Sequence, residues 1–384
     1  MSHSDVIIIG GGVIGLTIAR SLALRGVRDI CLLDKENLGT EASFAAAGML
    51  APQVEADADD HFFQLACQSR DMYRPFAADL LAETEIEIEL DTTGTLYLAF
   101  TEDEADECEH RYNWQSRVGL KVEKLTGAEA REFEACINPS CHGGLLFPDD
   151  IQVENRRLLC ALIESVKSHG VRLLSGTGVQ ELLVENDCIK GVSTAAGRVD
   201  SPTVVVAAGC WTGQIHIGGN PRHSVNALVP RIEPVRGQMV CLDARPQLTR
   251  HVIYSPRGYL VPRRDGRLLA GSTSEPVGFA KHATAGGVKS ILDHAVEISP
   301  AVENLPISDS WAGLRPKAAD GLPVLGPCGE IEGLFYATGH YRNGILLAPV
   351  TGELIAEAIT SDSVSKALIS FSPDRFSQTA VGIS

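Results

Sequence analysis

Four residues near the start of the chain have the types and the order that bind a dinucleotide. Gly10, Gly12 and Gly15 form a G-x-G-x-x-G turn between two apolar runs, and Asp34 ends the second run. The first glycine permits a tight turn, the second lets the backbone approach the pyrophosphate, and the third lets a helix pack closely on a strand. The phosphates would contact the free N–H groups where that helix begins, near Val13, and the acid would bind the adenosine ribose. The sequence therefore predicts a dinucleotide site.

A candidate substrate site lies far along the chain at Arg315. An arginine guanidinium binds a carboxylate through two parallel hydrogen bonds, with a geometric selectivity that lysine lacks. Its neighbours Trp311, Gly313 and Pro316 indicate an enclosed setting, although the residues alone leave a surface ion pair as an equal alternative. Tyr259 opens an expected hairpin strand. Its hydroxyl either donates to the same carboxylate or belongs to a tyrosine at the edge of the core.

A second glycine turn follows an apolar strand near the other end of the chain. It comprises Gly339, His340, Tyr341, Arg342, Asn343, Gly344, Ile345 and Leu346. Backbone N–H groups at such a strand-to-helix turn can face the negative charge that collects near N1 and O2 of a reduced flavin. A plain NAD site does not need this second turn. The alternative is a packing helix that begins after a glycine.

The elements that position these residues follow from the apolar patterns. Strands are expected at residues 6–9, 30–33 and 95–100, and helices at 62–80, 102–119 and 155–169, the last capped by Asn155. Small residues fill 38–52, including Ala-Ala-Ala-Gly-Met-Leu at 45–50. They either let the main chain lie against a flat ligand or begin an alanine-rich helix.

The second half of the chain returns to the nucleotide sheet twice. Strands within 171–194 suggest a small antiparallel meander, and 203–208 reads as a buried strand. Antiparallel strands are expected over 231–275, where Asp265-Gly266 is a strong hairpin signal. A helix at 287–298, a strand at 333–339 and a helix at 345–360 complete the pattern.

Composition narrows the classes of partner and compartment. The 384 residues carry a net charge of −16, which argues against nucleic acid and anionic membranes as partners. The ten cysteines contain no C-x-x-C pair and no zinc spacing, so we expect no metal. Cys31, Cys160 and Cys241 lie in apolar runs and are expected to be buried thiols. With no targeting signal or membrane span expected, we expect a cytoplasmic protein.

The ordered motifs together resemble the D-amino acid oxidase superfamily, and within it the glycine oxidases of thiamine biosynthesis. The segments that carry the resemblance are GGGVIG, SFAAAGML, VVVAAGCW, PVRGQ, GYLVPRRDGRLLAGST, WAGLRP, DGLPVLGP and YATGHYRNGILLAPVTGELIAE. The resemblance extends from Val6 to about Phe376. It implies non-covalent FAD, oxidation of a small amine by hydride transfer to flavin N5, and reoxidation by oxygen to give hydrogen peroxide. With glycine the products would be glyoxylate and ammonia.

The resemblance also assigns residues to the cofactor. Besides the two glycine turns, FAD would be lined by Val13, Ile14, Asp34, Lys35, Ala42, Ser43, Ala47, Gly48, Met49, Val179 and Gly209. Relatives with covalent flavin attach it through a Cys or His near the ring. Phe44 and the 311–315 segment offer neither.

For the substrate, the resemblance favours Arg315 as the carboxylate ligand and places Arg342 at a second substrate-side position, or else at flavin N1–O2. Tyr254 matches another pocket aromatic. No side chain need act as a general base if the amine arrives unprotonated, because orientation over the flavin supplies most of the catalysis. Two positions depart from a well-studied type of relative, which has histidine at Arg257 and methionine at Ser274. They leave the preference among glycine, sarcosine and small D-amino acids open.

The expected fold is α/β, with a Rossmann-type, glutathione-reductase-like FAD domain interleaved with an antiparallel-sheet substrate domain. The FAD domain would comprise 1–85, 150–225 and 320–372, and the substrate domain 86–149 and 226–319. Two alternative functions stay open: a D-amino acid or sarcosine dehydrogenase that reduces a quinone or a partner protein, and a non-catalytic flavin subunit that relays electrons. The resemblance also implies a homo-oligomer, with a tetramer as the expected form.

Overall fold

Apolar runs from both ends of the chain meet in one largely parallel sheet. The computed structural model describes residues 2–219, 229–361 and 364–376. Its six-stranded sheet has the order β20-β21-β13-β2-β3-β9, and only β20 runs antiparallel to its neighbour. The strands are β2 (Val6–Ile9), β3 (Ile30–Leu33), β9 (Arg172–Leu174), β13 (Val204–Val206), β20 (Val324–Pro327) and β21 (Leu334–Thr338). A sheet buried on both faces explains why these strands are almost wholly apolar.

Helices cover one face of this sheet, and a second sheet covers the other. Val6 and Ile8 of β2 point into a core with the helices, whereas Ile7 and Ile9 point into a core with the second sheet. The helices are α1 (Val13–Leu24), α4 (His61–Thr84), α7 (Asn155–Ser168) and α10 (Ala348–Thr360). The five-stranded second sheet comprises β1 (Ser2–His3), β12 (Gly197–Asp200), β11 (Cys188–Thr194), β10 (Val179–Glu185) and β14 (His216–Ile217), in that order.

The other lobe is built on an eight-stranded sheet with the order β19-β15-β18-β17-β16-β5-β7-β6. Its strands are β5 (Thr95–Ala99), β6 (Glu123–Thr126), β7 (Gly143–Phe147), β15 (Ile232–Asp243), β16 (Val252–Ser255), β17 (Gly258–Pro262), β18 (Arg267–Gly271) and β19 (Ile307–Ala318). α9 (Ala285–Ile298) packs on one face of this sheet. α5 (Glu102–Arg117) and α6 (Gly127–Phe133) lie near β6 and β7.

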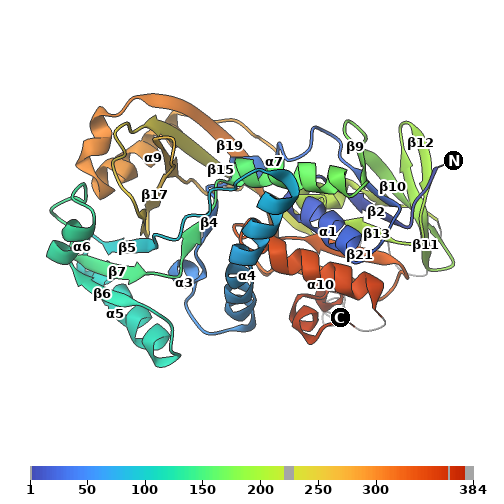
Figure 1. The fold of residues 1–384 in the computed structure, drawn as a ribbon, viewed down its shortest axis with the longest axis horizontal. Coiled ribbons are helices and arrows are strands. Elements are labelled where there is room, and N and C mark those ends of the chain that lie inside the picture. The colour runs from blue at the N-terminus through green and yellow to red at the C-terminus, as the bar shows by residue number, and fades with distance from the viewer. Residues whose placement is uncertain (1, 220–228, 362–363, 377–384) are drawn as a thin grey trace, which may run out of the picture.

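Figure 1 shows that segments far apart in the sequence alternate between the two lobes, and that β15 and β19 reach from one toward the other. Short elements connect the lobes near the centre. They are α2 (Ala42–Ala45), β4 (Met49–Leu50), α3 (Pro52–Glu55) and β8 (Ile151–Gln152). Three 3-10 helices complete the fold: η1 (Gly209–Gln214), η2 (Pro300–Asn304) and η3 (Lys366–Phe371). Residues 1, 220–228 and 362–363, which the expected domain ranges include, lie outside the described residues.

Four local predictions are wrong. Glu154, not Asn155, caps α7 by accepting from the backbone N–H of Arg157. β9 does not join a meander but pairs in parallel with β3 in the nucleotide sheet. Cys160 is exposed, because it lies on the solvent side of α7, whereas Cys31 and Cys241 are buried. α10 begins at Ala348 rather than Ile345, because residues 345–347 still belong to the preceding turn.

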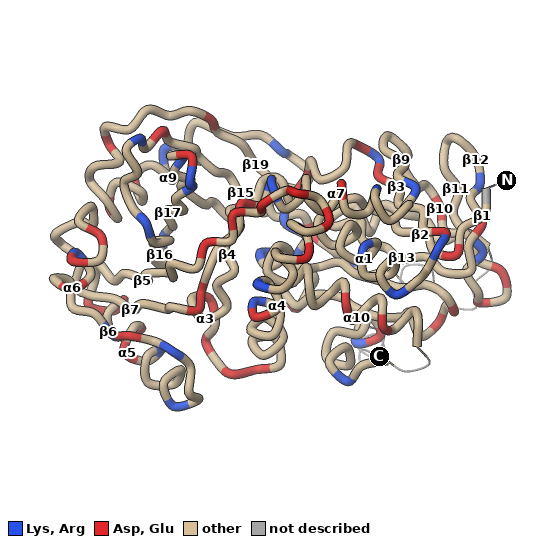
Figure 2. Tube along the Cα trace, viewed as in Figure 1, with Lys and Arg blue, Asp and Glu red and all other residues tan. Residues whose placement is uncertain are grey.

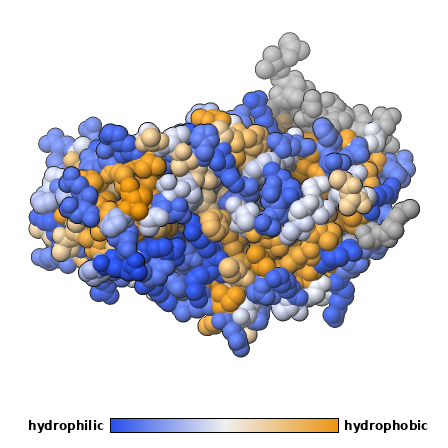
Figure 3. All heavy atoms as spheres, turned by 90° about the horizontal axis from the view of Figure 1, so that it is seen from above, coloured by the Kyte–Doolittle hydropathy of each residue, from blue (hydrophilic) through white to orange (hydrophobic). Residues whose placement is uncertain are grey.

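The surface reflects the acidic composition. Acidic side chains are spread over both lobes and gather in the connection between α3 and α4 (Figure 2). Seen from above, the molecule is mostly hydrophilic, with apolar residues gathered in two areas of that face (Figure 3). No helix within the described ranges is long and apolar enough to cross a membrane. The same residues contain no group of three or more His, Cys, Asp or Glu side chains placed to hold a metal ion.

Candidate active site

A cavity of about 420 Å³ brings the two glycine turns together with the two predicted substrate residues. The predicted residues that line it are Gly10, Gly12, Val13, Ile14, Asp34, Lys35, Ala42, Ser43, Ala47, Gly48, Met49, Val179, Gly209, Tyr259, Arg315, His340, Tyr341, Arg342, Gly344 and Ile345. Gly15, Gly339, Asn343 and Leu346 do not line it. Residues of both lobes therefore share one cavity.

The amino-terminal turn has the form that a pyrophosphate and ribose require. The Asp34 carboxylate accepts hydrogen bonds from the backbone N–H groups of Gly11 (2.6 Å) and Glu36 (2.8 Å), which fixes it at the cavity wall. Burial raises the pKa of Asp34 above its usual value, against these two hydrogen bonds. At Gly15 an added Cβ would lie 1.9 Å from the carbonyl oxygen of Gly10, so the helix packs as closely as only glycine allows.

The next wall of the cavity is the small-residue segment 42–49, and side chains from other elements hold its carbonyl groups. Asn155 of α7, Trp311 of β19 and Arg263, which follows β17, donate to four of them. The acceptors are the oxygens of Ser43 and Phe44 for Asn155 (2.8 and 3.1 Å), Ala45 for Trp311 (3.1 Å) and Ala47 for Arg263 (2.8 Å). The segment is thereby fixed from both lobes, and its small side chains leave room for a flat ring.

Arg263 is a buried cation at the centre of this support. It also donates to the side chain of Gln152 (2.8 Å) and the carbonyl of Val153 (3.0 Å), and its Nε lies 3.9 Å from the Glu154 carboxylate. Burial lowers the pKa of Arg263 to about 10. The guanidinium therefore stays charged at neutral pH and remains a donor to the segment.

The carboxyl-terminal turn does not direct all of its backbone N–H groups at the cavity, contrary to the expectation. The backbone N–H of Tyr341 donates to the Pro316 carbonyl (2.8 Å), and that of Asn343 donates to the His340 carbonyl (2.9 Å). These two N–H groups are therefore used within the protein and do not face the cavity. The Nε2 of His340 pairs with Thr351 Oγ1 (3.1 Å), and burial lowers the pKa of His340 to about 3. The imidazole is neutral at physiological pH.

Arg315 offers an uncompensated positive charge to the cavity. Its guanidinium donates to the Thr273 carbonyl (2.9 Å) and to Ser272 Oγ (2.8 Å), which are both neutral. Within residues 2–219, 229–361 and 364–376, no carboxylate lies within 4.0 Å of it. A half-buried arginine without a counter-ion fits a substrate carboxylate.

Arg342 differs because its charge is already paired. Its Nε and Nη2 donate to Glu55 Oε1 (3.1 and 2.7 Å), and Nη2 also donates to the Tyr254 hydroxyl (3.2 Å). Burial alone would lower the pKa of Arg342, but Glu55 and Tyr254 hold it above the usual value. Tyr254 is stacked between Tyr97 and Tyr259, with ring centroids 5.8 and 6.0 Å away.

The Tyr259 hydroxyl lines the cavity but contacts Met239 Sδ (3.3 Å), a weak acceptor. A stronger acceptor from a ligand would therefore find this donor available. Ser274 contacts the Tyr341 hydroxyl (3.3 Å) at the edge of the site. Arg257, which stands where the well-studied relative has histidine, does not line the cavity, because its exposed side chain pairs with Glu104 and Glu297.

Sequence reasoning missed three residues at the substrate end. Glu55, Gly237 and Met239 all line the cavity. Gly237 lies in the PVRGQ segment, whose glycine was the one available signal. Glu55 and Met239 stand in no motif that would distinguish them from ordinary surface and core residues.

A family model matches most of the chain. Residues 5–358 match the DAO model, which is described as FAD dependent oxidoreductase. A glycine oxidase of Geobacillus kaustophilus is 36% identical over 378 residues, which cover 98% of each chain. A bifunctional protein ThiO/ThiG of Synechocystis is also 36% identical over 98% of this chain, but the match covers 54% of that longer protein.

The fold comparison gives the same result. The crystal structure of glycine oxidase from Geobacillus kaustophilus superposes with a TM-score of 0.92 at 36% identity and covers 98% of this chain and 99% of the other. The expected FAD-binding fold is therefore confirmed.

Proposed function

The chain belongs to the DAO family of FAD-dependent oxidoreductases and is an FAD-dependent amine oxidase; from this premise we propose that it deaminates glycine and other small amino acids such as sarcosine and small D-amino acids. The products with glycine would be glyoxylate, ammonia and hydrogen peroxide. The similarity to glycine oxidases and to ThiO/ThiG proteins supports this proposal and a role in thiamine biosynthesis. The ten free cysteines support a cytoplasmic location, where thiols stay reduced.

One observation carries the substrate class: Arg315 is a cavity-lining guanidinium with no carboxylate partner among the described residues. A substrate carboxylate would supply the missing counter-charge through two parallel hydrogen bonds. Arg342 lines the same cavity, but its charge is already paired with Glu55. This arrangement favours a small substrate with a single carboxylate.

The residues bind and orient rather than exchange protons. Bound FAD would supply the two-electron acceptor, held by the Gly10 turn, the 42–49 segment and the 340–345 turn. Arg315 would bind the carboxylate and Tyr259 would donate to it, which places the amine-bearing carbon against the flavin. His340 is neutral and already paired with Thr351, so it serves the turn and not the amine. The amine would therefore react in its unprotonated form.

An anaerobic panel of amines, followed by flavin absorbance, tests the function. Glycine should bleach the flavin of the wild-type protein. Arg315→Leu should need at least about a hundredfold more glycine, because a desolvated ionic contact is lost, while FAD stays bound. Arg257→Leu is the matched control outside the cavity. An unchanged glycine dependence in Arg315→Leu would remove this residue from the carboxylate site.

Peroxide yield distinguishes the enzymatic alternatives. Near-stoichiometric peroxide under air supports the oxidase. Dye reduction without peroxide would support a dehydrogenase that passes electrons to a quinone or a partner protein. No bleaching by any amine would support an electron-relay subunit.

A further inference from the structure

We propose that Asp150 and Arg111 are positioning residues that clamp the two ends of helix α3 and thereby fix Glu55 against Arg342. The inference rests on the proposed function, since it concerns the substrate end of the same cavity. Neither Asp150 nor Arg111 lines that cavity. They act through α3, whose last residue, Glu55, does line it.

Asp150 holds the first end of the helix. Its side chain is fully buried in the turn before β8. Its two carboxylate oxygens accept hydrogen bonds from the backbone N–H groups of Gln53 (3.3 Å) and Val54 (2.9 Å). Arg70 of α4 lies 3.5 Å away and compensates the charge. A carboxylate at this end satisfies N–H groups that a helix leaves unpaired.

Arg111 holds the opposite end. This α5 residue is 5% exposed, and one of its terminal nitrogens donates to the carbonyl groups of Val54 (2.9 Å), Gln53 (3.3 Å) and Ala56. These are the carbonyls that a helix leaves unpaired at its last turn. Above about pH 7, where Asp150 is ionised, an anion at one end and a cation at the other both favour the helix dipole.

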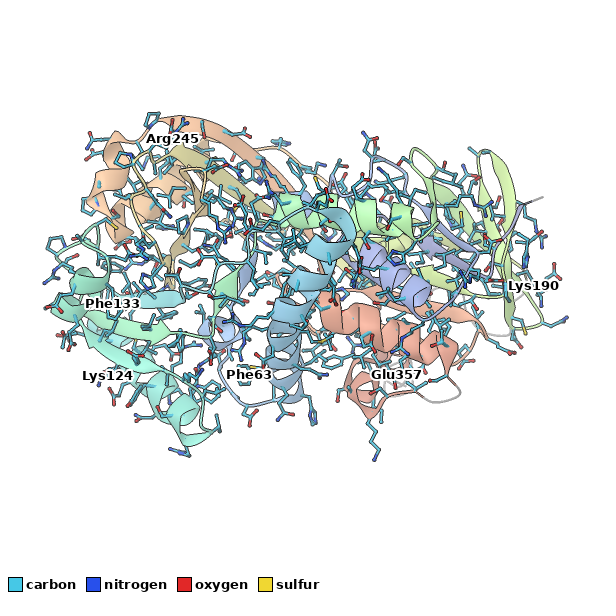
Figure 4. All side chains as sticks on the ribbon, in the orientation of Figure 1. Phe63, Lys124, Phe133, Lys190, Arg245 and Glu357 are labelled. Carbon is cyan, nitrogen blue, oxygen red and sulfur yellow. The ribbon has the colours of Figure 1, made fainter. Side chains whose placement is uncertain are left out.

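The middle of α3 is fixed as well. The fully buried Gln53 side chain donates to Gln115 (2.9 Å) and the Lys121 carbonyl (3.1 Å), and it accepts from Arg70 (3.1 Å). Arg70 lies on α4 and Gln115 on α5. These two helices contact each other through Phe63 of α4, labelled in Figure 4, which packs edge-on against Trp114 of α5 with ring centroids 5.5 Å apart. A four-residue helix cannot hold its own geometry. Its position is therefore set by buried partners from neighbouring elements.

The consequence reaches the substrate end through Glu55. Its carboxylate is 26% exposed and neutralises Arg342. If α3 shifted, Arg342 would lose its carboxylate partner and become, with Arg315, a second guanidinium in the cavity without a counter-ion. The clamp therefore keeps the cavity selective for a single carboxylate.

The test is a double-mutant cycle between Asp150→Asn and Glu55→Gln in the FAD-loaded protein. Two readouts are used: KM for glycine, and the Kd of acetate measured from flavin absorbance, which needs no turnover. We expect Asp150→Asn alone to change both constants by about tenfold, the scale of a lost buried charge-assisted hydrogen bond. FAD affinity should stay within about twofold, because neither Asp150 nor the two residues that it caps, Gln53 and Val54, line the cavity.

The cycle separates a positioning role from a general loss of stability. If Asp150 acts through Glu55, Asp150→Asn has no further effect on either constant in the Glu55→Gln background. Equal effects in both backgrounds would overturn the proposal, as would a lowered Tm with unchanged KM and Kd. Asp149→Asn is the matched control, because Asp149 pairs only with the exposed Lys121 (3.1 Å) among the described residues.

If Asp150→Asn does not fold, Arg111→Lys replaces it in the same cycle. Lysine keeps the charge but has a single terminal nitrogen, so it cannot hold the α3 carbonyl groups and also pair with Asp57 and Glu107, as the two terminal nitrogens of Arg111 do. Failure of the proposed function is recognised separately, by the absence of flavin bleaching in the wild-type protein with glycine. In that case the Kd of acetate still tests whether Asp150 acts through Glu55.

Discussion

The guanidinium of Arg315 lies directly over the α-carbon of Gly237. A Cβ added at Gly237 would be 2.3 Å from Cζ and both terminal nitrogens of Arg315. The two residues lie on the paired strands β15 and β19, where Gly237 faces Gly313 and Val235 faces Arg315. The absence of one side chain therefore creates the space in which the candidate carboxylate ligand lies.

Gly237→Ala should displace Arg315 without removing it. We expect KM for glycine to rise by about tenfold or more, since an ångström-scale displacement weakens a bidentate contact. FAD affinity should change little. Gly286→Ala is the control, because an added Cβ on that exposed α9 residue meets nothing within 4 Å. Wild-type kinetics in Gly237→Ala would show that the guanidinium does not need its observed position.

Glu55→Gln should broaden the substrate range toward a second carboxylate. The substitution removes the charge that neutralises Arg342 while keeping the shape of the side chain. We expect the ratio of kcat/KM for D-aspartate to that for glycine to rise about tenfold, the scale of one ionic contact in a partly desolvated site. Steady-state peroxide assays with both substrates measure the ratio. A constant ratio would contradict the assigned role of the Glu55–Arg342 pair.

Arg263→Met should weaken FAD binding. The substitution removes the donor to the Ala47 carbonyl. It also removes one of the two arginines near the buried Glu154, which keeps only Arg267 of that pair. We expect the Kd of FAD to rise about tenfold and the Tm of the holoprotein to fall, because a buried charge-assisted hydrogen bond is lost. Titration of the apoprotein by flavin fluorescence measures the first effect. The neighbouring Arg264→Met is the control, since Arg264 is exposed and pairs with Glu87.

His340 should make the protein less stable in mild acid. Its pKa is lowered to about 3 in the folded state, whereas in the unfolded chain it is about 6.5. Between these values the unfolded state binds more protons, so the free energy of unfolding falls as the pH falls below about 6.5, by up to about 1.4 kcal/mol per pH unit. His340→Gln should remove this contribution. Urea unfolding at pH 7.5 and pH 5 measures it, and a difference between variant and wild type that does not change with pH would contradict the assignment.

Asp150 should change the free energy of unfolding with pH in the direction opposite to His340. Burial raises its pKa to about 7 in the folded state, despite Arg70 and two backbone hydrogen bonds, and the unfolded value is about 3.9. The folded state binds more protons across this range, so this contribution to stability is lost as the pH rises from about 4 to about 7. Asp150→Asn should therefore make the loss of stability in mild acid steeper than in the wild type. The same urea series checks the sign.

Local patterns predicted the fold well, because each nucleotide motif is short and contiguous. The first turn, its helix and the strand that ends before Asp34 all lie where the sequence places them. Long-range pairing was not predictable in the same way. Nothing in the sequence near Gly237 indicates that Arg315 lies over it, since that contact depends on the register of β15 and β19. The three donors to the 42–49 segment are likewise distant from it in sequence.

Side-chain direction explains the remaining differences at the site. The resemblance aligns Arg257 with a histidine position of relatives, but it does not say where the side chain points. Ion pairs with Glu104 and Glu297 hold that side chain at the surface. Arg342 lines the cavity as expected. Its partner Glu55, however, belongs to a helix of four residues that is too short to show a periodic sequence pattern. Charge compensation of this kind becomes visible only when distant segments are brought together.

The support of segment 42–49 has a thermodynamic consequence for the whole molecule. Its carbonyl groups are held by Asn155 in the nucleotide lobe and by Trp311 and Arg263 in the other. If FAD binds only when this segment is ordered, its binding stabilises the contacts that the segment makes with both lobes. FAD binding should therefore couple the unfolding of the two lobes, so that the holoprotein melts in one cooperative transition at a temperature that rises with FAD concentration.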